Sequence, residues 1–255
     1  MKIKIVTMDD FPEIDRLREE FEVSNNADIC IAVGGDGAFV KAAREFDGPI
    51  LPIRSGKALS SGFYADLSLD DIGFIIENLQ EKKYTVEKLE NKIELRYKNK
   101  KYYAVNETTL KNIHREVNFK VYQVTKEARE EIYPYIMGGD GILITGATGS
   151  TAYNKSAGGP LILSSQIFCM TFLNVDGPYR NPIVVDANKI IEIEIVKYNG
   201  LLDYDSVRIA ELKPGDTFDV RLSDKELKVV RFNKKREGLA AKLERIITSR
   251  MVKDL

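Results

Sequence analysis

A short glycine-rich run with one acid in it, Gly34-Gly35-Asp36-Gly37, combines residue types that handle phosphate groups. It follows the apolar run 28–33 and precedes a helical pattern over 38–46, so it lies between a buried strand and a helix start. Backbone N–H groups and the helix dipole bind anions at such a place, and glycines let the backbone approach a phosphate closely. We therefore expect Gly34 and Gly35 to contact the phosphates of a ligand.

Asp36 is the unusual member of this run, because a carboxylate repels the phosphates that it faces. Its presence makes sense if it bridges to a magnesium ion or removes a proton from an attacking hydroxyl. The structural alternative is a tight turn in which Asp36 caps the following helix. The run contains neither the Gly-Lys-Ser/Thr of a Walker loop nor the GxGxxG fingerprint, so it does not identify the reaction by itself.

A longer segment, over 139–160, is crowded with Gly, Ser and Thr. A strand pattern over 141–145 leads into it. Small residues allow a flat ligand to lie against the backbone, and the hydroxyls supply donors and acceptors for ribose and base edges. Tyr153 can stack on a ring. A polar turn before a helix would explain the glycines but not so many hydroxyls, so the segment favours nucleotide binding.

The elements that position the first run form an α/β pattern. Strand and helix patterns alternate before residue 84, which is typical of a parallel sheet; they cover 2–7, 11–21, 28–33, 38–46, 50–53 and 70–80. The apolar spacing over 238–251 predicts a terminal helix that returns to pack on this domain. We predict a Rossmann-like α/β domain over 1–83 and 234–255.

Period-two patterns dominate after residue 84 and predict a second, β-rich domain over 84–233. Asn99-Lys100 lies between two such patterns and marks a hairpin. The expected strands cover 92–98, 102–110, 117–124, 141–145, 168–174, 190–198, 206–210, 218–222 and 227–232.

Composition excludes several classes of protein. The 38 basic and 39 acidic residues give a net charge of −1, which argues against a nucleic-acid partner. No apolar run approaches the roughly 20 residues that span a bilayer, and nothing resembles a signal peptide, so we expect a cytoplasmic protein without a membrane partner. Cys30 and Cys169 lie in apolar runs, which indicates reduced core thiols rather than a metal site.

In order and content, these motifs resemble the NAD kinase family. The run 34–37, the Asn106-Glu107 pair at the end of a hairpin strand, and the pattern TGxTGSTAYxxSAGGP over 145–160 follow the family's order. The resemblance covers the chain from about Asp28 to the terminal helix. It implies a kinase that phosphorylates the 2′-hydroxyl of the adenosine-side ribose of NAD to give NADP. It also implies ATP or polyphosphate as donor and Mg²⁺ or another divalent metal as cofactor.

Residue roles follow from the same resemblance. Asp36 matches the catalytic aspartate, which takes the proton from the ribose hydroxyl and helps to organise metal and phosphates. Asp140 matches an aspartate that reaches the nicotinamide side of a neighbouring subunit's ligand, which implies a homodimer or homotetramer with a shared active site. The β-rich domain would bind NAD, and the implied NAD-binding residues are Gly37, Phe63, Tyr64, Asn106, Glu107, Asp140, Thr148, Ala152, Tyr153 and Ser156.

The sequence departs from the family pattern in three places. One of them follows Cys169, where the family often has a Pro-His pair and this chain has Gly177-Pro178-Tyr179-Arg180. Residues 54–62 are longer and more basic than the family's Asn-Thr-Gly-x-Leu-Gly turn, and Arg54 and Lys57 there either contact donor phosphates or belong to a solvated loop. The family's later Asp-Gly corresponds to residues 203–206, Asp-Tyr-Asp-Ser, without the glycine.

Two other functions remain open from the sequence. The run 34–37 also occurs in phosphofructokinases and in lipid kinases, so a lipid kinase is one alternative. A non-catalytic NAD(P)-binding regulator is the other, although it gives no reason for Asp36. A purely structural α/β protein would leave both glycine-rich segments without a purpose.

Overall fold

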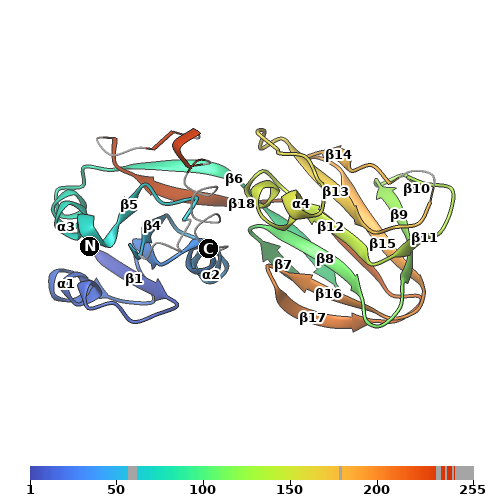
Figure 1. The fold of residues 1–255 in the computed structure, drawn as a ribbon, viewed down its shortest axis with the longest axis horizontal. Helices are drawn as coiled ribbons and strands as arrows, with labels where there is room; N and C mark the ends of the chain where they lie inside the picture. The colour runs from blue at the N-terminus through green and yellow to red at the C-terminus, as the bar shows by residue number, and fades with distance from the viewer. Residues whose placement is uncertain (57–61, 178–179, 234–236, 239, 243, 245–255) are drawn as a thin grey trace. The chain divides into compact units, whose positions relative to one another are not determined.

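The computed structural model describes residues 1–56, 62–177, 180–233, 237–238, 240–242 and 244. The chain divides into two compact units, one of residues 1–89 with 227–255 and one of residues 90–226 (Figure 1). Two long strands, β6 (Thr85–Tyr97) and β18 (Thr217–Arg231), contribute residues to both units.

The first unit contains a parallel sheet. Its strands run in the order β2-β1-β3-β4, with β5 and the end of β18 both pairing parallel to β4. The strands are β1 (Lys2–Thr7), β2 (Glu22–Val23), β3 (Ile29–Val33), β4 (Ile50–Arg54) and β5 (Leu67–Ser68); the helices are α1 (Glu13–Glu20), α2 (Asp36–Glu45), α3 (Ile72–Gln80) and the 3₁₀ turn η1 (Leu69–Asp71).

Helices cover both faces of this sheet, which is why β3 is apolar along its whole length. α1 and α3 bury Ile14, Leu17, Ile75 and Leu79 against the strands on one side (Figure 1). α2 buries Phe39 and four neighbouring residues on the other side. The expected Rossmann-like α/β fold of this part of the chain is confirmed.

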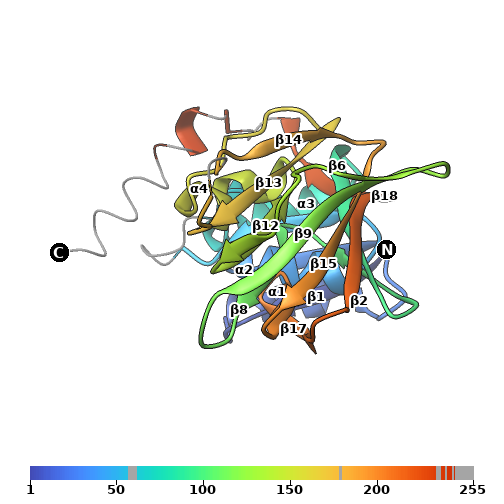
Figure 2. The same cartoon turned by 90° about the vertical axis from the view of Figure 1, so that its right-hand side faces the viewer.

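The second unit is built from antiparallel strands. One sheet has the order β14-β13-β12-β8-β16-β17. Facing it, β15 pairs with β9 and with β18 (Figure 2), β9 pairs with β10 and β11, and β6 pairs with β7. The bounds are β7 (Lys100–Ala104), β8 (Glu107–Asn112), β9 (Val117–Val124), β10 (Arg129–Glu131), β11 (Met137–Gly139), β12 (Gly141–Thr145), β13 (Ile167–Leu173), β14 (Ile183–Asp186), β15 (Ile190–Lys197), β16 (Gly200–Tyr204) and β17 (Val207–Leu212).

The core of this unit lies between the two sheets. Alternate residues such as Phe119 and Val121 of β9, and Ile142 and Ile144 of β12, point into it and are buried. The period-two pattern therefore predicted the β-rich domain correctly.

Four expected strands differ from the structure. The pattern over 102–110 is broken at Val105 and Asn106, whose backbone N–H groups donate to the Asp205 side chain instead of to a neighbouring strand. The patterns over 218–222 and 227–232 form one strand, β18, which continues through the polar residues between them. The strand expected over 206–210 begins at Val207, since Asp205 and Ser206 form the turn between β16 and β17.

Residues 240–242 are helical, and Lys242 Nζ lies 2.7 Å from Asp66 Oδ1 of the same unit. The rest of the predicted terminal helix lies outside the described residues. Cys30 and Cys169 are free and buried, as expected. Among the described residues, no helix is long and apolar enough to span a membrane.

Candidate functional site

The glycine run lies at the carboxyl end of β3. β3 ends at Val33, and α2 begins at Asp36 with Gly35 as its N-cap. Gly34 has a φ of 138°, which favours glycine, and its N–H donates to the Ile53 carbonyl at 2.9 Å. The first N–H groups of α2 therefore lie at the edge of a parallel sheet where α/β proteins bind phosphates.

Asp36 is the first residue of α2, and the N-cap position belongs to Gly35, so the capping interpretation is wrong. Asp36 Oδ1 accepts the backbone N–H of Tyr64 at 3.4 Å. The Tyr64 ring stacks on Phe39 of α2 with centroids 4.3 Å apart, and Phe63 meets Tyr64 edge-on at 5.4 Å. The structure thus places Phe63 and Tyr64, both predicted to bind NAD, beside Asp36.

A buried arginine that sequence patterns did not single out holds the segment after Tyr64. Arg231 Nη1 donates to the Tyr64 carbonyl at 2.6 Å and to Asp66 Oδ2 at 3.0 Å. Arg231 is buried at the end of β18, and 167 residues separate it from Tyr64. No local pattern could have revealed this contact, because it depends on strand pairing within the folded unit.

Of the two basic residues predicted to contact donor phosphates, only Arg54 lies within the described residues. Arg54 is partly buried at the end of β4, and its Nη2 lies 3.5 Å from Glu237 Oε1. Lys57 lies outside the described residues. A phosphate role for either residue stays a prediction.

Asn106 and Glu107 stand at the break between β7 and β8, where the Asp205 carboxylate fixes the backbone. It accepts the N–H groups of Val105 at 2.8 Å, Asn106 at 2.7 Å and Glu107 at 3.3 Å. Asn106 Oδ1 and Glu107 Oε2 are buried and have no hydrogen-bond partner within the described part of the chain. Burial, together with the Asp205 carboxylate, raises the pKa of Glu107 to about 7, against the opposing charge of Lys111.

The Gly/Ser/Thr segment begins where β12 pairs with β8. Thr145 is in register with Glu107, and its Oγ1 donates to the Asn106 carbonyl at 2.7 Å. The chain then forms the 3₁₀ turn η2 (Thr148–Thr151) and the short helix α4 (Tyr153–Ser156). A Cβ at Gly149 would lie 1.9 Å from the Asn106 carbonyl oxygen, so only glycine allows this approach. The structure therefore brings the segment directly against the Asn106-Glu107 pair.

Four predicted residues of this segment differ in exposure. Thr148 is buried, Ala152 is partly exposed, and Tyr153 and Ser156 are exposed. Lys111 Nζ lies 4.9 Å from the centroid of the Tyr153 ring. Partial burial of the side chain raises the pKa of Tyr153, and the negative charges of Glu107 and Asp140 add to this effect. Tyr153 therefore lies within the electrostatic reach of both predicted ligand-binding carboxylates.

Asp140 links β11 and β12 and is held by two amides. Its Oδ1 accepts from Asn112 Nδ2 at 2.8 Å, and its Oδ2 accepts from Asn174 Nδ2 at 2.7 Å. These bonds fix the carboxylate at the end of β12 opposite to Thr145. The predicted contact with a neighbouring subunit's ligand stays a prediction.

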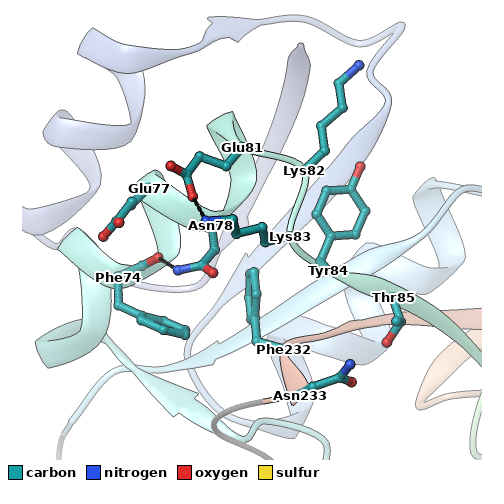
Figure 3. Close-up of a pocket in the computed structure, with 10 residues that line it drawn as sticks. All are labelled: Phe74, Glu77, Asn78, Glu81, Lys82, Lys83, Tyr84, Thr85, Phe232 and Asn233. Atoms are coloured by element: carbon teal, nitrogen blue, oxygen red, sulfur yellow. Dashed lines mark hydrogen bonds and ion pairs between the residues drawn. The ribbon is translucent and has the colours of Figure 1, made fainter.

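A separate pocket of about 540 Å³ lies in the first unit, at the carboxyl end of α3 (Figure 3). Asn78 Nδ2 donates to the Phe74 carbonyl at 2.8 Å, and Lys83 pairs with Glu81 there. None of the predicted site residues lines it; the lining residues are Phe74, Glu77, Asn78, Glu81, Lys82, Lys83, Tyr84, Thr85, Phe232 and Asn233.

No three His, Cys, Asp or Glu side chains within the described residues lie close enough together to hold a metal ion. A metal held by one carboxylate and by substrate phosphates would need no such group, and Mg²⁺ commonly binds in this way.

Comparison with known protein families gives two matches. The ATP-NAD kinase N-terminal domain matches residues 8–84, and the ATP-NAD kinase C-terminal domain matches residues 105–232. An NAD kinase of Sulfurimonas denitrificans is 30% identical over 216 residues, which are 82% of this chain and 74% of the relative. An NAD kinase of Thermoplasma volcanium is 28% identical over 215 residues, covering 81% and 75%.

Two solved structures share the fold. A yeast NADH kinase complexed with NADH superposes with a TM-score of 0.79 at 16% identity, covering 97% of this chain and 86% of the other. An NAD kinase from Archaeoglobus fulgidus in complex with ATP gives a TM-score of 0.76 at 18% identity, covering 96% and 99%. At these identities the similarity concerns the fold.

Proposed function

Because the chain belongs to the NAD kinase family, we propose that it transfers a phosphoryl group to the 2′-hydroxyl of the adenosine-side ribose of NAD, giving NADP. ATP is the favoured donor, since the matching family is described as ATP-NAD kinase. Polyphosphate is the alternative donor. A lipid kinase is not favoured, because the matched families cover both halves of the chain.

One observation carries the assignment of the NAD site. Asn106 Oδ1 and Glu107 Oε2 are buried without a hydrogen-bond partner in the described part of the chain. A buried polar atom without a partner costs about 1–3 kcal/mol. Ribose hydroxyls would supply the missing hydrogen bonds. The hydroxyl-rich turn beside them, which carries Thr148, offers further contacts for the adenosine.

Asp36 is the proposed catalytic residue. Phosphoryl transition states are loose, so a kinase acts mainly by positioning the reacting groups and by neutralising charge. The N–H groups at the start of α2 would bind donor phosphates. Asp36 is the first residue of that helix, and its carboxylate would accept the proton of the ribose hydroxyl. General base catalysis of this kind contributes about 10²–10⁴ in rate.

A divalent metal fits this arrangement through Asp36. Mg²⁺ binds through one or two carboxylates, substrate phosphates and water, so one aspartate beside a phosphate-binding loop is a suitable protein ligand. When bound, the metal would neutralise charge on the transferred phosphoryl group. Asp36 would then hold the metal and the hydroxyl in a fixed relation.

We further propose a cytoplasmic homodimer or homotetramer in which Asp140 reaches the nicotinamide side of a neighbouring subunit's ligand. The Asn112 and Asn174 amides support this proposal, since they fix the orientation of the Asp140 carboxylate. Asp140→Ala should then weaken NAD binding only in the assembled protein. Light scattering of the purified chain tests the assembly, and a monomer that is fully active would contradict it.

The direct test of the function is NADP formation. The purified chain is incubated with NAD, Mg²⁺ and either ATP, another nucleoside triphosphate or polyphosphate, and NADP is measured with an NADP-specific dehydrogenase. We expect NADP with at least one donor. Tight NAD binding without NADP from any donor would instead indicate a non-catalytic regulator. Phosphorylation of diacylglycerol in place of NAD would indicate a lipid kinase.

A further inference from the structure

Glu90 of β6 is a buried carboxylate that no sequence motif singled out. Only 3% of the surface of Glu90 is exposed to solvent. Its Oε1 accepts the N–H of Thr148 at 2.8 Å, and its Oε2 accepts the N–H of Ala147 at 2.7 Å. Both donors belong to the turn that follows β12. Glu90 therefore binds the segment that carries Thr148. Its two partners, Ala147 and Thr148, lie 57 and 58 residues later in the chain.

These two hydrogen bonds fill a gap in the turn's own bonding. Its hydroxyls satisfy carbonyl groups, since Ser150 Oγ donates to the Ala147 carbonyl and Thr151 Oγ1 donates to the Thr148 carbonyl. No side chain of the turn caps the N–H groups at the start of η2. Buried N–H groups need an acceptor. Glu90 supplies one oxygen to each, and a planar carboxylate offers both acceptors at once.

Stability alone does not explain a carboxylate at this position. Within the described residues, Glu90 has no cationic partner, and burial raises its pKa to about 7 despite the two N–H donors. Burying a charge without an opposite charge is costly. The benefit of the carboxylate lies in the geometry that it imposes on the turn.

Gly146 leaves room for this contact, because it has no Cβ. A Cβ at residue 146 would lie 2.7 Å from Glu90 Oε2 and 3.4 Å from its Cδ. Glycine is therefore needed for the carboxylate to reach the two N–H groups. On the other side of the turn, Thr145 pairs with Glu107 and donates to the Asn106 carbonyl. Glu90 thus fixes residues 146–148 relative to Asn106 and Glu107.

We propose that Glu90 is a positioning residue for NAD, which holds the 146–148 turn in the form that receives the adenosine of the substrate. This inference rests on the proposed function. Glu90 acts through the backbone of Ala147 and Thr148 rather than by touching the substrate. Its loss should therefore affect NAD binding more than the chemical step.

The test compares steady-state NADP formation by wild type and Glu90→Gln, with NAD and then the donor varied. Glutamine has the same shape but offers one acceptor and turns an NH₂ toward the second N–H. We expect the NAD KM to rise about 10-fold, which corresponds to about 1.4 kcal/mol, with kcat and the donor KM changed less than about twofold. Glu130→Gln is the matched control, because it removes an exposed carboxylate from β10 of the same unit. It should change none of these constants.

A double-mutant cycle with Gly146 distinguishes positioning from a general structural effect. Gly146→Ala should raise the NAD KM in wild type, because the methyl group displaces the Glu90 carboxylate. In a Glu90→Ala background the same change should add little, since the carboxylate is already absent. Additive effects on the NAD KM would overturn the inference.

The outcomes separate the two proposals. If the wild type forms no NADP, the proposed function fails and the inference fails with it. If the wild type is active and Glu90→Gln has a normal NAD KM, only the inference fails. If Glu90→Gln does not fold, the NAD KM of Gly146→Ala tests the inference by itself. An unchanged NAD KM in that variant overturns the positioning role.

Discussion

Glu90 and Glu107 are both buried, and burial raises the pKa of each to about 7, but they differ in their partners. Both oxygens of Glu90 accept backbone N–H groups. Glu107 Oε2 has no partner in the described part of the chain. A carboxylate whose two oxygens both accept backbone N–H groups of the protein fixes the conformation of that backbone. A carboxylate with an unused buried oxygen can instead bind a ligand. This difference assigns positioning to Glu90 and ribose binding to Glu107.

Glu107→Gln should mainly weaken NAD binding. The amide loses one acceptor for the ribose hydroxyls, which costs about 1–3 kcal/mol and raises the NAD KM roughly 5–150-fold. The kcat should stay within about threefold of wild type, because Glu107 touches no reacting atom in the proposed mechanism. Kinetics with NAD varied at saturating donor measure both constants. A loss confined to kcat would show that the ribose-binding role is wrong.

At the scale of elements, two tight turns hold the β-rich unit in register. Lys98 and Asn99 join β6 to β7, and Asp205 and Ser206 join β16 to β17, all four with positive φ. Two-residue hairpin turns require this conformation. The second turn also aims the Asp205 carboxylate at the backbone of Asn106 and Glu107. Its geometry therefore reaches the candidate NAD site.

Ser206→Gly should stabilise the protein without changing its NAD KM. Ser206 has a φ of 64°, a conformation that costs a residue other than glycine about 1 kcal/mol. We expect a gain of about 0.5–1 kcal/mol, since glycine also loses more entropy on folding. Asn99→Gly, at a φ of 63°, is the matched control and should gain less, because asparagine tolerates this region. Thermal melting compares them, and an equal or larger gain for Asn99→Gly would contradict this reasoning.

The sequence predicted elements that depend on local periodicity and failed where distant contacts decide. The strand pattern of β12 and the apolar run of β3 placed both glycine-rich segments correctly at strand ends. The break at Asn106 was missed, because its cause is a carboxylate 99 residues away. Glu90 and Arg231 were missed for the same reason. The charged residues of β6 gave no sign that Glu90 is buried, since burial follows from the packing of the turn after β12.

At the scale of the whole molecule, the two carboxyl groups with raised pKa values make the stability of the protein depend on pH. An unfolded glutamate has a pKa of about 4.5, and Glu90 and Glu107 titrate at about 7 in the folded chain. Between these values the folded state binds more protons than the unfolded state. The stability that the two groups contribute is therefore present below about pH 4.5 and is lost as the pH rises through about 7.

Wild type should lose stability relative to the double variant Glu90→Gln with Glu107→Gln between pH 5 and pH 8. Each group contributes roughly 3 kcal/mol to this difference, because one unit of pKa corresponds to about 1.4 kcal/mol. Urea unfolding of both proteins at several pH values measures it. Glutamine does not titrate, so the two stability curves should diverge as the pH rises. Parallel curves would show that neither glutamate has a raised pKa.

The most direct measurement is the kcat of Asp36→Asn at saturating NAD and donor, with NAD affinity determined separately by calorimetry. Asp10→Asn, at an exposed aspartate of the same unit, serves as the control. We predict that Asp36→Asn loses about 10²–10⁴ in kcat with its NAD affinity nearly unchanged, while Asp10→Asn behaves like wild type. An Asp36→Asn enzyme that forms NADP at the wild-type rate would contradict the role of Asp36 as base and metal ligand.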